Sequence, residues 1–166
     1  MKNIQIKELS PEQVTLKYVS WLKDPKIIKY SDLQYVDVNM KSQIEYVKKM
    51  KMSEENILFG IFFSKKHIGN ILLKSINLNH NRAEISYLIG CRKLWGKGIA
   101  SYAISYVCEY AKQEKKLFKL YAGVAKNNKP SQKTLEKNGF VLEGERKYHL
   151  KFNNCFINQL DYGKIL

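Results

Sequence analysis

The chain has 166 residues, of which 45% are hydrophobic and only three are proline, a composition that is typical of one folded core and excludes extended disorder. Its formal net charge of +14 favours an anionic partner, although a lysine-rich codon bias explains the excess equally well. Because the chain has no apolar run long enough for a membrane span, no signal-peptide pattern and only three scattered cysteines, we expect a cytoplasmic protein without a bound metal.

The first half of the chain predicts a strand, two helices and three further strands. Apolar and polar residues alternate in NIQIKEL, residues 3–9, as they do in a half-buried strand. Helical spacing recurs over residues 14–22, which Asp24-Pro25 closes, and again over residues 41–52. Residues 56–63 and 67–78 predict two strands joined by a hairpin turn at 64–66, and residues 81–90 predict a third strand after a polar turn.

The second half predicts a helix, a strand, a short helix and two closing strands. Residues 98–115 carry one apolar stripe at helical spacing, and LFKLYAGVA at 117–125 predicts a strand. The short helix covers residues 129–139 and ends at Gly139, before a pair of strands at 140–150 and 155–166. The expected fold class is therefore mixed α+β, in a single domain over residues 1–166.

A glycine-rich bend precedes the long helix. Gly96 and Gly98 flank Lys97 where the helix begins, and the free N–H groups of a helix N-terminus bind phosphate oxygens. The stretch lacks the G-x-x-x-x-G-K-[ST] spacing of a nucleotide triphosphatase, and Ser101 stands where a dinucleotide-binding fingerprint needs glycine or alanine. The alternative to a diphosphate site is a bend that serves only tight packing or a positive φ.

Three motifs resemble the GCN5-related N-acetyltransferase (GNAT) superfamily. KLWGKG at 93–98 resembles its pyrophosphate-binding pattern Q/R-x-x-G-x-G/A, with Lys93 in place of glutamine or arginine. AEISYLIG at 83–90 is similar to the family's fourth strand, and residues 128–144 are similar to its N-x-x-S…L-E-K-x-G-F…E-G segment. WGKGIA together with NGFVLEGE is similar to the subgroup that acetylates ribosomal-protein N-termini, but relatives that act on amino sugars, polyamines and antibiotics look much the same.

The resemblance implies a fold and a cofactor. The fold is a mostly antiparallel sheet of about seven strands flanked by about four helices, in which the fourth strand splays from the fifth near residues 88–91. Acetyl-CoA binds in that opening, where the backbone amide of Ile89 receives the oxyanion of the thioester. The implied cofactor-binding residues are Leu88, Ile89, Cys91, Lys93, Leu94, Trp95, Gly96, Lys97, Gly98, Ile99, Ala100, Asn128, Ser131 and Lys133.

The resemblance also implies the catalytic groups. Glu84 occupies the position of the family's general base, which must deprotonate an amine of pKa about 10; an ion pair with Arg82 or a lysine is the alternative. Ser131 is the first candidate for the acid that protonates the departing thiolate, and Tyr148 is the second, although serine here is equally typical of a helix cap. Cys91 as an acetyl carrier has little support, because no histidine lies near it in the sequence.

The expected acceptor is an amine, either a protein N-terminus of the ribosomal type or a small molecule such as a nucleotide-linked amino sugar. The predicted substrate-binding residues are Trp21, Tyr30 and Glu84; the two rings would line the acceptor site or else belong to the core. The competing function is a non-catalytic nucleic-acid-binding module on the same fold, but the lysines are dispersed rather than clustered. A homodimer is left open, a membrane partner is not expected, and nucleic acid is expected only through a ribosomal acceptor.

Overall fold

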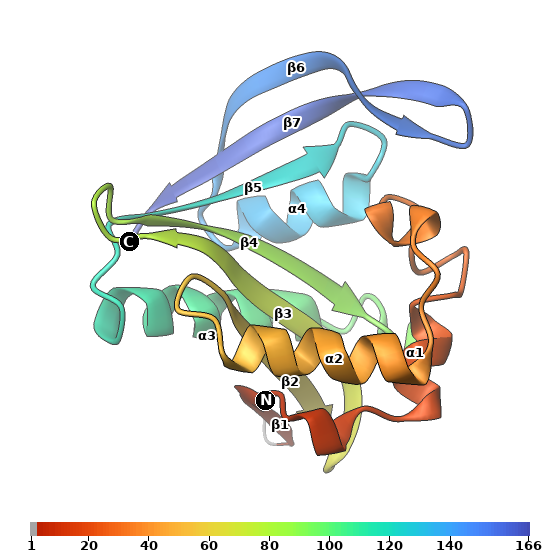
Figure 1. The fold of residues 1–166 in the computed structure, drawn as a ribbon. Coiled ribbons are helices and arrows are strands. Elements are labelled where there is room, and N and C mark those ends of the chain that lie inside the picture. Colours follow the sequence, from red (N-terminus) through yellow and green to blue (C-terminus); the bar gives the residue numbers. More distant parts are fainter. Residues whose placement is uncertain (1–2) are drawn as a thin grey trace.

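The computed structural model describes residues 3–166, which build a seven-stranded sheet with strand order β1-β2-β3-β4-β5-β7-β6 (Figure 1). Every neighbouring pair of strands is antiparallel except β4 and β5. The expected mixed fold with a mostly antiparallel sheet is confirmed. The strands are β1 (Ile4–Glu8), β2 (Ile57–Phe63), β3 (Lys66–Asn77), β4 (Arg82–Ile89), β5 (Lys119–Ala125), β6 (Val141–Phe152) and β7 (Cys155–Ile165).

The helices begin where side chains satisfy their first N–H groups. The Thr15 hydroxyl accepts from the N–H of Tyr18 at 3.1 Å, so the first helix begins after Thr15 rather than at residue 14. Asn39 and Ser42 cap the second helix reciprocally, each side chain accepting from the other residue's N–H. The α-helices are α1 (Leu16–Trp21), α2 (Met40–Lys51), α3 (Ile99–Gln113) and α4 (Lys129–Lys137), and the short 3-10 segments, which were not expected, are η1 (Pro11–Gln13), η2 (Asp32–Tyr35) and η3 (Arg92–Leu94).

The sheet buries both of its faces. On one face, α3 packs its apolar stripe onto the strands; on the other, α1 and α2 form a separate apolar cluster. Successive side chains of a strand point to opposite faces, and in β2 Leu58 joins the cluster of α1 and α2 while Phe59 joins that of α3. This double burial explains why β2 is an unbroken apolar run instead of an alternating one.

The parallel pair β4 and β5 is joined at only three positions. Arg82–Glu84 pairs with Lys119–Tyr121, and each strand then follows its antiparallel neighbour, β4 along β3 and β5 along β7. Figure 1 shows the two strands diverging toward their C-terminal ends. The splay was expected near residues 88–91 but begins just after Glu84. We call the opening between residues 85–89 of β4 and 122–125 of β5 the seam.

Gly139 ends α4 as expected. Its φ of +80° lies in the left-handed region, and the N–H of the following Phe140 returns to the carbonyl of Leu135 at 3.1 Å. Phe140 is thereby turned into the core, where it is 2% exposed. This reversal ends α4 and leads the chain into β6.

Candidate active site

The bend before α3 holds two glycines in the left-handed region. Gly96 has a φ of +73°, and Gly98, the N-cap of α3, has a φ of +75°. A Cβ at Gly96 would meet nothing within 4 Å, so this glycine serves its backbone angle and open space rather than tight packing. The first turn of α3, which the structure describes in full, contains no acidic side chain that could compete for its free N–H groups. The bend therefore fits a diphosphate.

Hydrogen bonds fix the bend to the end of β4. The indole N–H of Trp95 donates to the carbonyl of Ile89 at 2.8 Å. The N–H groups of Gly90 and Cys91 both donate to the carbonyl of Ile68, at 2.8 and 3.1 Å. Two of the predicted cofactor-binding residues thus already use one backbone group within the protein, Ile89 its carbonyl and Cys91 its amide.

The predicted cofactor-binding side chains divide into two groups. Ile99 is 4% exposed and Leu94 packs partly against the α3 cluster, so only their backbone is available to a ligand. Lys93, Lys97 and Lys133 are exposed and free to meet phosphate oxygens as point charges. Lys93 and Lys97 thus lie in the segment just before a helix N-terminus that already favours negative charge.

Across the seam, the start of α4 carries Asn128 and Ser131. The Asn128 side chain caps the helix, because its Oδ1 accepts from the N–H of Ser131 at 3.4 Å. The Ser131 hydroxyl lies 2.7 Å from the hydroxyl of Tyr87, which comes from the part of β4 that does not pair with β5. Burial raises the pKa of Tyr87 above its usual value. The fourth-strand motif contains this tyrosine but indicates no role for it, because it is one of eleven and sits in an ordinary strand pattern.

Glu84 lies at the closed end of the seam. Its carboxylate forms an ion pair with Lys74 of β3, with Nζ and Oε1 3.1 Å apart, and the two side chains are 26% and 35% exposed. The strand register places these residues directly opposite each other. The ion-pair alternative considered for Glu84 is thus realised, with Lys74 rather than Arg82 as its partner. A carboxylate that remains partly exposed is still accessible to water.

The two predicted acceptor rings occupy different environments. Trp21 is 5% exposed; its ring packs on Tyr18 and His67, and it fills the space where a Cβ of Gly90 would lie. Such a ring belongs to the core and cannot stack on an acceptor without moving. Tyr30, in contrast, is half-buried, and its hydroxyl donates at 3.3 Å to the carbonyl of Asn127, in the connection between β5 and α4.

His67 is a buried polar group beside the Trp21 ring. Its Nε2 lies 2.8 Å from Oδ1 of Asn70 and 3.0 Å from the carbonyl of Gly69, whereas its buried Nδ1 has no hydrogen-bond partner. Burial lowers the pKa of His67, against the opposing effect of the bonds to Asn70 and Gly69. The neutral imidazole is therefore the form that the fold favours.

A wide hollow of about 720 Å³ opens between η2 and the tip of the β6–β7 hairpin. The Tyr35 hydroxyl donates to the carbonyl of Lys151 and holds the two segments together. Because Tyr30, just before η2, also contacts Asn127, the hollow lies at the same end of the sheet as the open end of the seam. The residues that line it are Asp32, Gln34, Tyr35, His149, Leu150, Lys151, Asn153 and Asn154.

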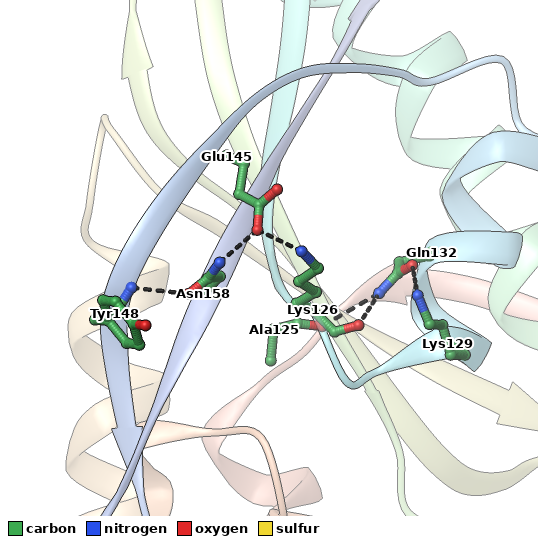
Figure 2. Close-up of polar contacts among 7 residues, drawn as sticks. All are labelled: Ala125, Lys126, Lys129, Gln132, Glu145, Tyr148 and Asn158. Carbon is green, nitrogen blue, oxygen red and sulfur yellow. Dashed lines mark hydrogen bonds and ion pairs between the residues drawn. The ribbon is translucent and has the colours of Figure 1, made fainter.

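Tyr148 lies on an irregular part of β6, far along a chain of polar contacts from α4 (Figure 2). Its φ is +53°, its side chain is 71% exposed, and its N–H donates to Oδ1 of Asn158 at 2.9 Å. Asn158 in turn donates to Glu145, which pairs with Lys126 at 2.7 Å. The structure therefore places Ser131 at the seam and leaves Tyr148 as an exposed ring on the hairpin.

Residues 3–166 contain neither a membrane-spanning helix nor a cluster of metal ligands. Within residues 3–166, no helix has the length and apolar character to cross a membrane. Over the same residues, no group of three His, Cys, Asp or Glu side chains could hold a metal ion.

Comparison with known proteins gives the same picture. A family model described as the acetyltransferase (GNAT) domain matches residues 4–141. The probable N-acetyltransferase YjcK of Bacillus subtilis is 34% identical over 133 residues, which are 78% of this chain and 72% of the relative. The uncharacterized N-acetyltransferase p20 of Bacillus licheniformis is 30% identical over 82% of this chain and 77% of its own.

The fold recurs in solved structures of acetyltransferases with coenzyme A bound. The spermidine N-acetyltransferase of Vibrio cholerae, in complex with CoA and spermine, superposes with a TM-score of 0.87 at 21% identity, covering 99% of this chain and 96% of that one. The relatives favour an enzyme over a non-catalytic nucleic-acid-binding module. With the family model matching most of the chain, and with a glycine bend suited to a diphosphate, the chain belongs to the GNAT family and is an N-acetyltransferase that uses acetyl-CoA.

Proposed function

We propose that the enzyme transfers the acetyl group directly from acetyl-CoA to a primary amine while both substrates are bound. The observation that carries this proposal is the seam, where pairing between β4 and β5 stops after Glu84 and Tyr121. An open strand edge offers N–H and C=O groups to an extended chain such as pantetheine. The glycine bend at the start of α3 would hold the pyrophosphate, with Lys97 and Lys133 as nearby charges.

Deprotonation of the amine is assigned to Glu84, acting through water. Leu88 follows Glu84 by four positions, about 13 Å along the strand at about 3.3 Å per residue. A carboxylate that far from Leu88, beside the predicted oxyanion site at Ile89, does not reach an amine there directly, and its partial exposure admits water.

Two groups in the seam would stabilise the reacting thioester. The backbone amide of Ile89 is assigned to the oxyanion that forms when the amine attacks the acetyl carbon. Ser131 is assigned the role of hydrogen-bond donor to the departing sulfur, because its hydroxyl lies at the start of α4 and contacts Tyr87 of β4 at the seam. Tyr148 is the less suitable acid, since its ring is 71% exposed on the hairpin.

The hollow between η2 and the hairpin is assigned to the acceptor. Its side chains include one carboxylate, Asp32, beside Lys151, His149 and several amides. A polycation such as spermidine would call for more negative charge, whereas a peptide N-terminus or a nucleotide-linked amino sugar matches a mixed lining in a strongly basic protein. We therefore favour a protein N-terminus of the ribosomal type or an amino sugar of this kind.

An acceptor screen tests the proposal. The enzyme is supplied with acetyl-CoA and, in turn, a peptide with a free N-terminus, a nucleoside diphosphate amino sugar and spermidine, and the release of the CoA thiol is followed. The peptide or the sugar should be acetylated faster than spermidine. A clear preference for spermidine would refute the assignment of the acceptor class. Failure of every amine, together with tight and salt-sensitive heparin binding, would instead support nucleic-acid binding.

A further inference from the structure

We propose that Tyr87 is a positioning residue, whose hydroxyl holds the hydroxyl of Ser131 so that the serine hydrogen faces the sulfur of CoA. The inference rests on the proposed function and goes beyond it, because Tyr87 lies within the AEISYLIG motif but has no role among the predicted site residues. Its ring comes from the part of β4 that pairs with β3 but not with β5, and it reaches α4, with the two hydroxyl oxygens 2.7 Å apart.

The direction of this hydrogen bond decides what Ser131 can do. Each hydroxyl has one hydrogen, and a serine that donates to Tyr87 has none left for a ligand. A phenolic O–H is a stronger donor than an aliphatic one, and Oγ of Ser131 at 2.7 Å is a nearer acceptor than the Ser131 carbonyl at 3.4 Å. The Thr134 hydroxyl also lies near the Tyr87 oxygen, and it donates its own hydrogen to the carbonyl of Pro130 at 2.8 Å. Tyr87 therefore donates to Oγ of Ser131, and the serine hydrogen is free.

Burial keeps this arrangement constant with pH. Tyr87 packs against the α3 cluster, and burial raises the pKa of its hydroxyl against the lowering effect of its hydrogen bonds with Ser131 and Thr134, which favours the protonated phenol. The N–H of Ser131 bonds to Asn128, which fixes the backbone from which the serine side chain extends. The serine is thus held both at its backbone and at its hydroxyl oxygen.

The hydroxyl hydrogen of Ser131 can bond to the CoA sulfur, on which negative charge develops during the reaction. When the bond between the acetyl carbon and sulfur breaks, its electron pair stays on sulfur, and a hydrogen bond from Ser131 stabilises that charge. The thiolate then takes up the proton that the amine has released, so the products are the acetamide and the CoA thiol. A bond accepted from Tyr87 strengthens the one that Ser131 donates.

The experiment titrates the thiol of bound CoA, followed by the ultraviolet absorbance of the thiolate, and needs no acceptor. The variants are Tyr87→Phe, Ser131→Ala, their double variant and a control, Tyr162→Phe. Tyr162 is matched because its hydroxyl also contacts α4, through Glu136 at 2.9 Å, but has no contact with Ser131. Desulfo-CoA, which lacks the sulfur, reports whether the rest of the cofactor still binds.

Losing the bond should favour the neutral thiol about 3- to 10-fold, the usual worth of one hydrogen bond. Tyr87→Phe and Ser131→Ala should therefore raise the pKa of the bound thiol, the double variant should match Ser131→Ala, and Tyr162→Phe should match the wild type. Desulfo-CoA should bind equally to all of them. Tyr87→Met serves as a second variant if the melting curve shows that Tyr87→Phe does not fold.

Three results would overturn the inference: a thiol pKa unchanged in Tyr87→Phe, a further shift when Tyr87→Phe is added to Ser131→Ala, or an equal shift in Tyr162→Phe. The first would show that Tyr87 is only structural, the second that it acts independently of the serine, and the third that any loosening of α4 suffices. If CoA and desulfo-CoA both fail to bind the wild type, the placement of the cofactor in the seam falls as well, which separates the two failures.

Discussion

Glu84 has two possible roles, a general base and an ion-pair partner of Lys74, and two variants separate them. Glu84→Gln removes both the carboxylate and the ion pair, whereas Lys74→Gln breaks the same ion pair and keeps the carboxylate. The pair joins side chains that are 26% and 35% exposed, so solvent screens it, and its loss should cost about 0.2–1 kcal/mol of unfolding free energy in either variant. For a chain of this size that is a fall in Tm of up to about 4 °C. As a structural residue, Glu84 would show no other effect.

As a base, Glu84 contributes far more to the rate. Losing a general base lowers turnover about 10²- to 10⁴-fold, or about 2.7–5.4 kcal/mol of transition-state free energy, several times the worth of the ion pair. Glu84→Gln should show this loss in kcat, with partial recovery at high pH where the free amine is abundant, while Lys74→Gln keeps most of its turnover.

The assay measures thiol release with a preferred acceptor and the melting curve of each variant. Equal turnover in the two variants would refute the base assignment, because both lack the ion pair and only one lacks the carboxylate. A loss in Glu84→Gln that is confined to KM would point to acceptor binding instead.

Three further outcomes are expected. Acetyl-CoA at 100 times its Kd should stabilise the wild type by about 2.7 kcal/mol, and Gly98→Val, which places a β-branched side chain at φ +75°, should melt lower and lose that gain; an unmoved wild-type curve would refute the cofactor site. Initial-rate plots should intersect, and Cys91→Ala should still transfer acetyl, whereas parallel lines with an acetylated cysteine would show a covalent route. Because burial lowers the pKa of His67, the imidazole binds a proton near pH 6.5 in the unfolded chain but stays neutral at that pH in the folded chain. Unfolding free energy should therefore fall as pH drops from 7 toward 5, and His67→Gln should reduce that slope; an unchanged slope would contradict it.

Local patterns predicted the elements of the fold well because each element obeys a short-range rule. Turn residues bounded the strands, the α3 stripe had helical spacing, and Gly139 lies where the αL cap is. The start of the seam was misplaced by several residues, since it depends on which neighbour each strand follows beyond Glu84. That choice is made by pairing between distant segments and leaves no local pattern.

The site was predictable only where backbone geometry dictates residue type. Glycine is needed at positive φ, so Gly96 and Gly98 were visible in the sequence. Whether an aromatic ring is core or surface is decided by tertiary packing, which is why Trp21 and Tyr30 looked alike and lie in different environments. Pairs such as Tyr87 with Ser131 and Glu84 with Lys74 join separate elements, and no spacing rule reveals them.

The seam also divides the backbone hydrogen bonds of the sheet into two sets. Strands β1 to β4 form one set and β5, β7 and β6 the other, and three residue pairs join them, although the apolar cluster under α3 runs beneath both. Separating the two sets of strands at the seam breaks few hydrogen bonds. The free energy of local opening should therefore be lower at the seam than in the rest of the sheet. Amide hydrogens on the facing edges of residues 85–89 and 122–125 then exchange with solvent early. A bound cofactor contacts both sets of strands and slows that exchange. The same local opening gives the product CoA a path out of the site.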